Sequence, residues 1–172
     1  MRGPGDTWGF IIAAALACLP ALLVTSAGAQ KNEIAASQAR FERETNPVER
    51  AKLMQRLGLD EFQEIKKDVS QGDVDAAARI LGQYRDEARS CVEGLDAKKI
   101  NAAKHSSGFK QLQISVQESL RQLDEIMAGL TADQQPEFAA ARSELQRMND
   151  HLVQELFPGN PPAKAPATKS DP

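Results

Sequence analysis

The chain has few cysteines and few aromatic residues. Its 172 residues include 2 cysteines, 1 tryptophan and 1 tyrosine, and aromatic residues make up 5% of the total. Trp8 and Cys18 lie in the first thirty residues, so the remainder has Cys91 and Tyr84 but no tryptophan. A single cysteine excludes an intramolecular disulfide in that remainder. A single tyrosine leaves no aromatic platform on which nucleic-acid bases or sugars stack.

Motifs that carry catalysis or hold a cofactor are also missing. The sequence has no Gly-x-Ser-x-Gly turn for a nucleophile, no glycine-rich phosphate loop and no Cys-x-x-Cys-His segment for haem attachment. The net charge of −3 is spread along the chain, unlike the basic face of a nucleic-acid binder. We therefore predict a protein that is not an enzyme, has no cofactor and does not bind nucleic acid.

The first thirty residues have the layout of a secretory signal peptide. Arg2 precedes an apolar run from Trp8 to Val24, and the small residues Ala27 and Ala29 fit the pockets of a signal peptidase. This pattern predicts cleavage between Ala29 and Gln30. The protein is accordingly expected to be exported, to a periplasm or to the outside of the cell.

Two other interpretations of this segment stay open. An uncleaved run would make a membrane anchor, but its length is at the low edge of the roughly 17–25 residues that span a bilayer, and Pro20 interrupts it. Lipidation at Cys18 is disfavoured because Ala15 stands where a larger aliphatic residue is usual and apolar sequence continues beyond the cysteine. A membrane is expected as a partner only if the segment is retained.

Apolar residues recur every three or four positions after the leader, which is the spacing of amphipathic helices. Because each apolar stripe needs a partner surface, the pattern predicts an all-α, up-and-down bundle of four to five helices. The expected helices cover residues 30–44, 47–70, 74 to about 104, 109–130 and 131–156. The expected organisation is a signal peptide at 1–29, a bundle domain at 30–157 and a disordered tail rich in Pro, Ala and Lys at 158–172.

Local signals mark several helix ends. The segment Asn46-Pro47-Val48-Glu49 has a capping asparagine and a proline in the first turn, and Gly72-Asp73 ends one helix and caps the next. Gly58 is compatible with a helix stop followed by a new cap, or with one helix that tolerates a glycine. We favour one helix there, with or without a kink.

Candidate metal or haem ligands are few. His151 and Glu155 lie on one face of the last helix at i and i+4, but a metal site needs a further ligand from another helix, which favours a solvated pair. The other histidine of the bundle, His105, lies in an expected turn. The methionines Met54, Met127 and Met148 lie on or near apolar stripes, where packing in the core is favoured over haem ligation.

Cys91 and Tyr84 lie on the apolar stripe of the same expected helix. A lone cysteine on such a stripe is expected to be a small buried hydrophobic residue, and to join two copies only if it is exposed. Tyr84 is expected in the core with its hydroxyl at the rim.

One pair of segments resembles a known motif. Leu130-Thr131-Ala132-Asp133-Gln134 is similar to the Leu-Thr-x-x-Gln motif of small, all-helical periplasmic stress chaperones and metal-stress sensors, and the segment 59–63, Leu-Asp-Glu-Phe-Gln, is similar with Asp in place of Thr. The resemblance implies a helical cradle that shields unfolded proteins. Any capped helix start that follows a leucine has the same pattern, however.

The function that these features favour is binding of a protein partner or self-association by an exported helical module. A stress chaperone-like protein is the first alternative, and a bundle with a small metal or haem site is the second.

Overall fold

A computed structural model describes residues 26–159 of the chain. This part folds entirely into helices, turns and loops, and no strand occurs within it. The predicted all-α class is therefore confirmed. The five helices are α1 (Ser26–Arg43), α2 (Pro47–Gln71), α3 (Val74–Ala97), α4 (Ser106–Met127) and α5 (Gln135–Leu156).

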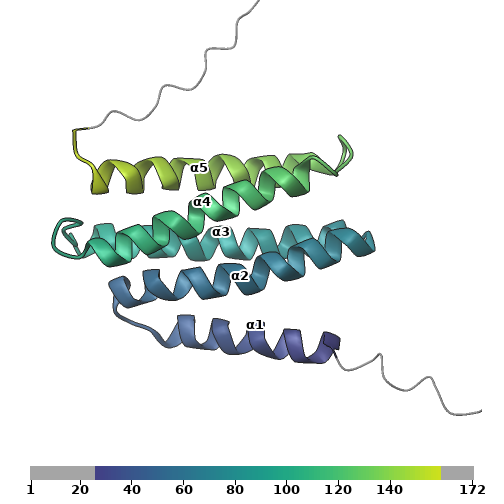
Figure 1. Ribbon diagram of the computed structural model, residues 1–172, viewed down its shortest axis with the longest axis horizontal. Coiled ribbons are helices and arrows are strands. Elements are labelled where there is room, and N and C mark those ends of the chain that lie inside the picture. The colour runs from purple at the N-terminus through teal and green to yellow at the C-terminus, as the bar shows by residue number, and fades with distance from the viewer. Residues whose placement is uncertain (1–25, 160–172) are drawn as a thin grey trace, which may run out of the picture.

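The five helices lie side by side, with α1 at one edge of the array and α5 at the other (Figure 1). α2 packs against α1, α3 and α4, whereas α5 packs against α3 and α4. Among the described helices, the backbone of α1 comes close only to that of α2. The helices α2 to α5 therefore share a common core, and α1 is added to the outside of it.

Two helix boundaries follow from the local signals in the sequence. Asn46 caps α2, because its Oδ1 accepts hydrogen bonds from the backbone N–H groups of Val48 at 2.9 Å and Glu49 at 3.4 Å. Gly72 ends the same helix in the left-handed region at φ 82°, where a side chain would be strained. Asp73 then caps α3 by accepting from the backbone N–H of Ala76 at 3.1 Å.

The expected extension of the third helix to about residue 104 is wrong. α3 ends at Ala97, and the chain reverses at Lys99, which has a φ of 50°. The backbone N–H of Ile100 then donates to the carbonyl of Leu95 at 3.0 Å, which closes the end of the helix. The next helix, α4, begins at Ser106, earlier than expected. His105 occupies its N-cap position and makes no capping bond through its side chain.

α2 runs without interruption through Gly58, so the interpretation as one helix is confirmed. The glycine is buried, and a Cβ atom there would lie 2.8 Å from Cε2 of Tyr84 on α3. Gly58 therefore permits close approach of two helices rather than a break in one.

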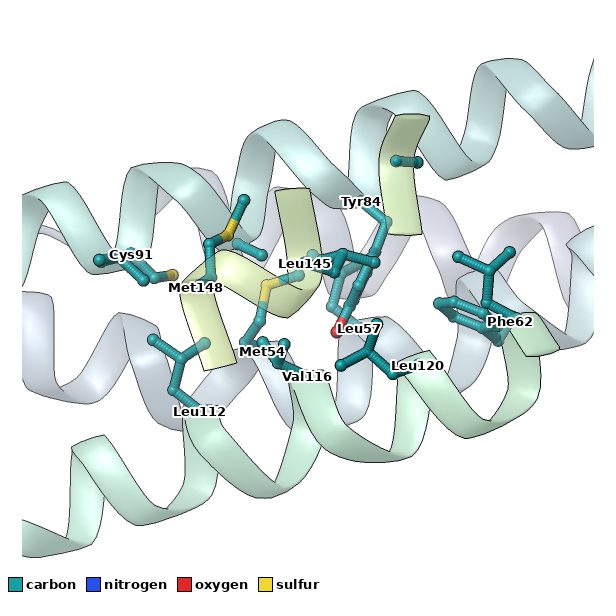
Figure 2. Close-up of a cluster of buried hydrophobic side chains, with 14 of the residues drawn as sticks. Met54, Leu57, Phe62, Tyr84, Cys91, Leu112, Val116, Leu120, Leu145 and Met148 are labelled. Atoms are coloured by element: carbon teal, nitrogen blue, oxygen red, sulfur yellow. The ribbon is translucent and has the colours of Figure 1, made fainter. Parts of the chain in front are cut away.

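The core lies between α2, α3, α4 and α5 (Figure 2). Met54 is fully buried and Met148 is 8% exposed, while Met127 packs partly buried at the edge of the core. The three methionines thus lie where the apolar stripes predicted core packing. Other large core side chains are Leu57, Phe62, Tyr84, Leu112, Val116, Leu120 and Leu145.

The predicted leader and tail fall mainly on residues 1–25 and 160–172, which lie outside the described residues. The predicted cleavage site between Ala29 and Gln30 lies within the first turns of α1. Among the described helices, none is long and apolar enough to cross a bilayer.

Candidate functional site

Three acidic side chains of α2 are buried. Asp60, Glu61 and Glu64 are 4%, 0% and 5% exposed, and acidic residues are rarely buried to this degree without a partner. The carboxylate of Glu64 lies 2.8 Å from Nζ of Lys67, one turn further along α2. Asp60 accepts a hydrogen bond from Oγ of Ser37 on α1 at 2.6 Å and pairs with Arg56 at 3.2 Å.

Glu61 has no such cation. Its Oε1 accepts a long hydrogen bond of 3.4 Å from Nε2 of Gln38 on α1, and its Oε2 is buried without a donor. Burial is the main cause that raises the pKa of Glu61 to about 9, and the neighbouring carboxylate of Glu87 raises it further. A carboxyl group with this pKa carries a proton at neutral pH.

Glu87 of α3 lies within hydrogen-bonding reach of Glu61. Its Oε1 accepts from Nε2 of Gln83 at 3.1 Å, whereas its Oε2 is buried without a donor. Burial also raises the pKa of Glu87, while the charge of Arg50 opposes that effect. One oxygen of each carboxyl group is therefore left without a donor, and the two groups are neighbours.

Arg50 completes this polar group from the N-terminal half of α2. Its guanidinium carbon lies 4.2 Å from the centre of the Phe41 ring, a cation–π contact that joins α2 to α1. Its Nε is buried without a hydrogen-bond partner. The charge of Arg50 acts on both Glu87 and Cys91, so the arginine lies toward α3 as well as under α1.

We call the contact between α1 and the bundle the α1 seam, made of Ser37, Gln38 and Phe41 on α1 with Arg50, Asp60, Glu61 and Glu87 beneath them. The seam is more polar than the rest of the core. Among the side chains described on α1, only Phe41 is fully buried, at 1% exposure. Among the described side chains, α1 is held by hydrogen bonds from Ser37 and Gln38 and by the buried ring of Phe41 over Arg50.

The sequence pattern did not single out the seam, although it contained a signal. Leu57, Glu61 and Ile65 are spaced four residues apart, so Glu61 occupies an apolar stripe. Glu87 likewise lies three residues after Tyr84 and four before Cys91 on the stripe of α3. An acid at a stripe position indicates a buried carboxyl group.

Cys91 is 1% exposed, as expected for a small buried hydrophobic residue. Burial raises the pKa of its thiol to about 12, which keeps the thiol protonated and unreactive. The exposure that a disulfide between two copies requires is not found.

The expectation that the Tyr84 hydroxyl reaches the rim is wrong. Tyr84 is fully buried, and its hydroxyl oxygen lies 2.7 Å from Oγ of Ser119 and 3.4 Å from Oγ of Ser115 on α4. Burial raises the pKa of Tyr84 to about 12. The small serines of α4 supply the hydrogen-bonding partners that permit this burial, and single-helix periodicity carries no sign of them.

The structure separates the two metal candidates, His151 and Glu155, by their surroundings. Nε2 of His151 lies 3.1 Å from a carboxylate oxygen of Asp96 on α3, at a surface hollow of about 420 Å³ that also contains Arg89 and Glu144. Glu155 is exposed. Within residues 26–159, no three His, Cys, Asp or Glu side chains come together in a way that holds a metal ion.

The two segments that resemble the chaperone motif have different surroundings. Gln134 Oε1 accepts from the backbone N–H of Thr131 at 3.1 Å in the turn before α5, which is one half of a capping box. The segment 59–63 instead lies in the middle of α2, where Asp60 is buried against α1 and caps no helix. Local hydrogen bonding and the α1 seam thus explain these residues.

A second hollow, of about 500 Å³, lies where the turn between α2 and α3 meets the start of α5. Four acids line it, and three belong to helix starts: Asp73 is the N-cap of α3, and Asp75 and Glu137 lie in first turns. The fourth, Asp133, lies in the turn before α5, where a hydrogen bond from Thr131 lowers its pKa. Acids at helix N-termini are stabilising, which explains the cluster.

Comparison of the chain with protein-family models, with curated proteins and with solved structures gives no match. The function is therefore argued from the residues and their geometry.

Proposed function

We propose that the chain is an exported, non-enzymatic up-and-down bundle that binds a helix of another protein on the face of α2 and α3 that α1 covers. The observation that carries this proposal is the α1 seam. α1 approaches the backbone of α2 alone, and two hydrogen bonds and one cation–π contact are its main described attachments. Such an element is displaced at lower cost than a helix of the common core.

The covered face recognises particular chemistry. Arg50 receives an aromatic ring, and the carboxyl groups of Asp60 and Glu61 receive hydroxyl and amide donors. On α1 these groups are Ser37, Gln38 and Phe41, which lie within one turn of each other. The partner that fits is an amphipathic helix with donor side chains followed, three or four residues later, by an aromatic residue.

A labelled copy of α1 is the simplest probe of this face. An N-acetylated fluorescent peptide of residues 30–46 is added to the chain from Gln30 to Pro172, and binding is followed by fluorescence anisotropy. The proposal expects saturable binding, because the peptide competes with α1 of the same chain. A peptide with Phe41→Ala is the matched control and should bind at least about tenfold more weakly, since it lacks the ring that covers Arg50.

A staple between α1 and α2 gives a second control within one protein. Cysteines introduced as Ser37→Cys and Asp60→Cys replace two side chains whose oxygens lie 2.6 Å apart. The oxidised protein should not bind the peptide, whereas the chain with its own side chains should. Peptide binding that persists after oxidation, or no binding to the unmodified chain at any pH from 5 to 9.5, would show that this face is not the binding surface.

Light scattering separates a foreign partner from a second copy. The proposal expects a monomer over the micromolar range, because the partner is another protein. A dimer that forms with rising concentration and disappears on stapling would instead assign the face to exchange of α1 between two copies. Suppression of aggregation of an unfolded client, tested with the stapled and unstapled forms, decides whether the partner class is unfolded protein.

A further inference from the structure

We propose that Glu61 and Glu87 hold one proton between them while α1 is docked, and that loss of this proton releases α1 and opens the binding face. This inference rests on the proposed function, because it assigns the regulation of that same face. Two buried carboxylate oxygens, one on each glutamate, lack a hydrogen-bond donor. They are Oε2 of Glu61 and Oε2 of Glu87, although the two carboxyl groups are within hydrogen-bonding reach.

A single proton satisfies both atoms. If Glu61 is protonated at Oε2, its O–H donates to Oε2 of Glu87, and the outer oxygens keep the donors they already have, from Gln38 and Gln83. Without the proton, two carboxylates face each other in a buried site, and like charges at that distance disfavour the doubly ionised form. All four carboxyl oxygens therefore have a hydrogen-bond partner only when the pair holds one proton.

The charges around the pair show which carboxyl group keeps the proton. From α1, Gln38 faces Glu61 and Glu42 acts on Glu87; from α3, Gln83 and Cys91 face Glu87 and Tyr84 faces Glu61. Asp60 of α2 repels a charge on Glu61, whereas the hydrogen bond from Gln83 and the cation of Arg50 favour a charge on Glu87 and together oppose its repulsion by Glu42. The charge is thus placed on Glu87 and the proton on Glu61.

Loss of the proton acts on α1 because α1 is the part that moves most easily. Ionised Glu61 requires water or a cation, and the described residues around it supply one amide at 3.4 Å. Its neighbours on α2 belong to the core, since Phe62, the next residue, and Ile65, one turn further along, are both fully buried. Lifting α1 admits water without opening that core. The face is therefore closed at acid and neutral pH and opens as pH rises toward 9.

The titration itself is tested by NMR with carbon-13 in the glutamate side-chain carboxyls. The Glu61 carboxyl carbon, assigned by comparison with Glu61→Gln, should titrate at least two pH units above an ordinary glutamate. In Glu87→Gln the pKa of Glu61 should fall, since the neighbouring charge is gone. A Glu61 carboxyl that titrates at an ordinary pH overturns the proposal.

The coupling to α1 is tested by binding of the 30–46 peptide between pH 6 and 9.5. In the unmodified chain, affinity should rise at least about tenfold through this range. In Glu61→Gln, whose amide stays neutral and still donates to Glu87, the rise should be lost. Glu64→Gln is the matched control, because Glu64 is equally buried in α2 but is bound to Lys67, and it should keep the rise.

The outcomes separate the two proposals. Peptide binding that is the same at every pH, or a rise that Glu61→Gln retains, overturns the shared proton while leaving the binding face in place. The acetylated peptide has no group that titrates between pH 7 and 9.5, and the pKa values of Tyr84 and Cys91, at about 12, lie above the range. Circular dichroism at each pH confirms that each variant is folded. If Glu61→Gln is not, Glu87→Gln is used instead, and its rise in affinity should move to lower pH with the pKa of Glu61.

Discussion

The ring of Tyr84 closes against the backbone of Gly58. A Cβ atom at position 58 would lie 2.8 Å from Cε2 of the tyrosine, well inside the contact distance of two carbon atoms. The tyrosine cannot easily move away, because its ring meets Phe62 edge-on with the centres 5.2 Å apart and its hydroxyl lies 2.7 Å from Oγ of Ser119. The approach of α2 to α3 therefore depends on the absence of a side chain.

Gly58→Ala should lower the free energy of unfolding by about 1–3 kcal/mol, because overpacking in a filled core outweighs the helix propensity of alanine. Urea unfolding followed by circular dichroism measures the change. Gly82→Ala in α3 is the control: beyond its chain neighbours and the nearby helix backbone, no atom lies within 4 Å of the added Cβ, so that variant should gain up to about 1 kcal/mol. Equal stabilisation by both substitutions would contradict the close contact.

Glu61→Gln should make the protein more stable at pH 8 and reduce the dependence of stability on pH. The pKa of Glu61 is about 9 in the folded protein against an ordinary value of 4.5, so the folded state binds the proton more tightly than the unfolded state. Stability then falls as pH rises from about 4.5 to about 9, by up to about 1.4 kcal/mol for each pH unit.

Urea unfolding of the unmodified chain and of the variant at pH 5, 7 and 8.5 measures this slope. The difference between the two proteins should grow with pH and reach a few kcal/mol. Glu64→Gln again provides the comparison, since its carboxylate has Lys67 as a partner and its loss should not stabilise the protein. A constant difference across the three pH values would mean that Glu61 is ionised in the folded state.

The start of α2 and the turn into α3 could be predicted from the sequence because their signals are local. Asn46 and Asp73 accept hydrogen bonds from N–H groups two or three residues away, so short segments hold all the information. The end of α3 could not, because residues 95–104 contain no glycine or proline that marks a helix end. The chain instead turns at Lys99, and Ile100 after it packs partly buried against the core.

The candidate site was harder to predict, because its residues come together only when the helices pack against each other. Glu61 and Glu87 are 26 positions apart, and a helical pattern shows each as one acid among many. Only the packing of α2 on α3 brings the two together, and it buries Glu61 fully and Glu87 in part. The burial of the Tyr84 hydroxyl has the same origin, since its partners Ser115 and Ser119 belong to α4.

The Cys91 thiol should react slowly with alkylating reagents in the folded protein. Its pKa is raised from 9.0 to about 12, so the reactive thiolate is about a thousandfold scarcer at pH 8, in addition to the shielding by the core. Mass spectrometry after iodoacetamide treatment, with and without urea, measures the two rates. Rapid labelling of the folded chain, or a disulfide dimer on a non-reducing gel, would restore the interpretation that Cys91 joins two copies.

Asn46→Ala should lower the free energy of unfolding by about 1 kcal/mol, within the usual 0.5–2 kcal/mol for loss of an N-cap. The N–H groups of Val48 and Glu49 would lose the acceptor that the asparagine provides. The neighbouring Thr45→Ala, at an exposed position in the same loop, is the control and should change stability little. Thermal unfolding of both variants checks the prediction, and equal effects would contradict the role of the cap.

Processing between Ala29 and Gln30 should give a mature protein that begins at Gln30. The cut removes residues 26–29 from α1, and the described hydrogen bonds from α1 to α2 come later, from Ser37 and Gln38. Residues 30–43 then remain, and isolated helices of ~12–15 residues are marginal in water, so the helicity of α1 depends on its seam with the bundle. Mass spectrometry of the protein from its native envelope measures the N-terminus. A mass that includes residues 1–29 would indicate an anchor, and a lipid on Cys18 would indicate a lipoprotein.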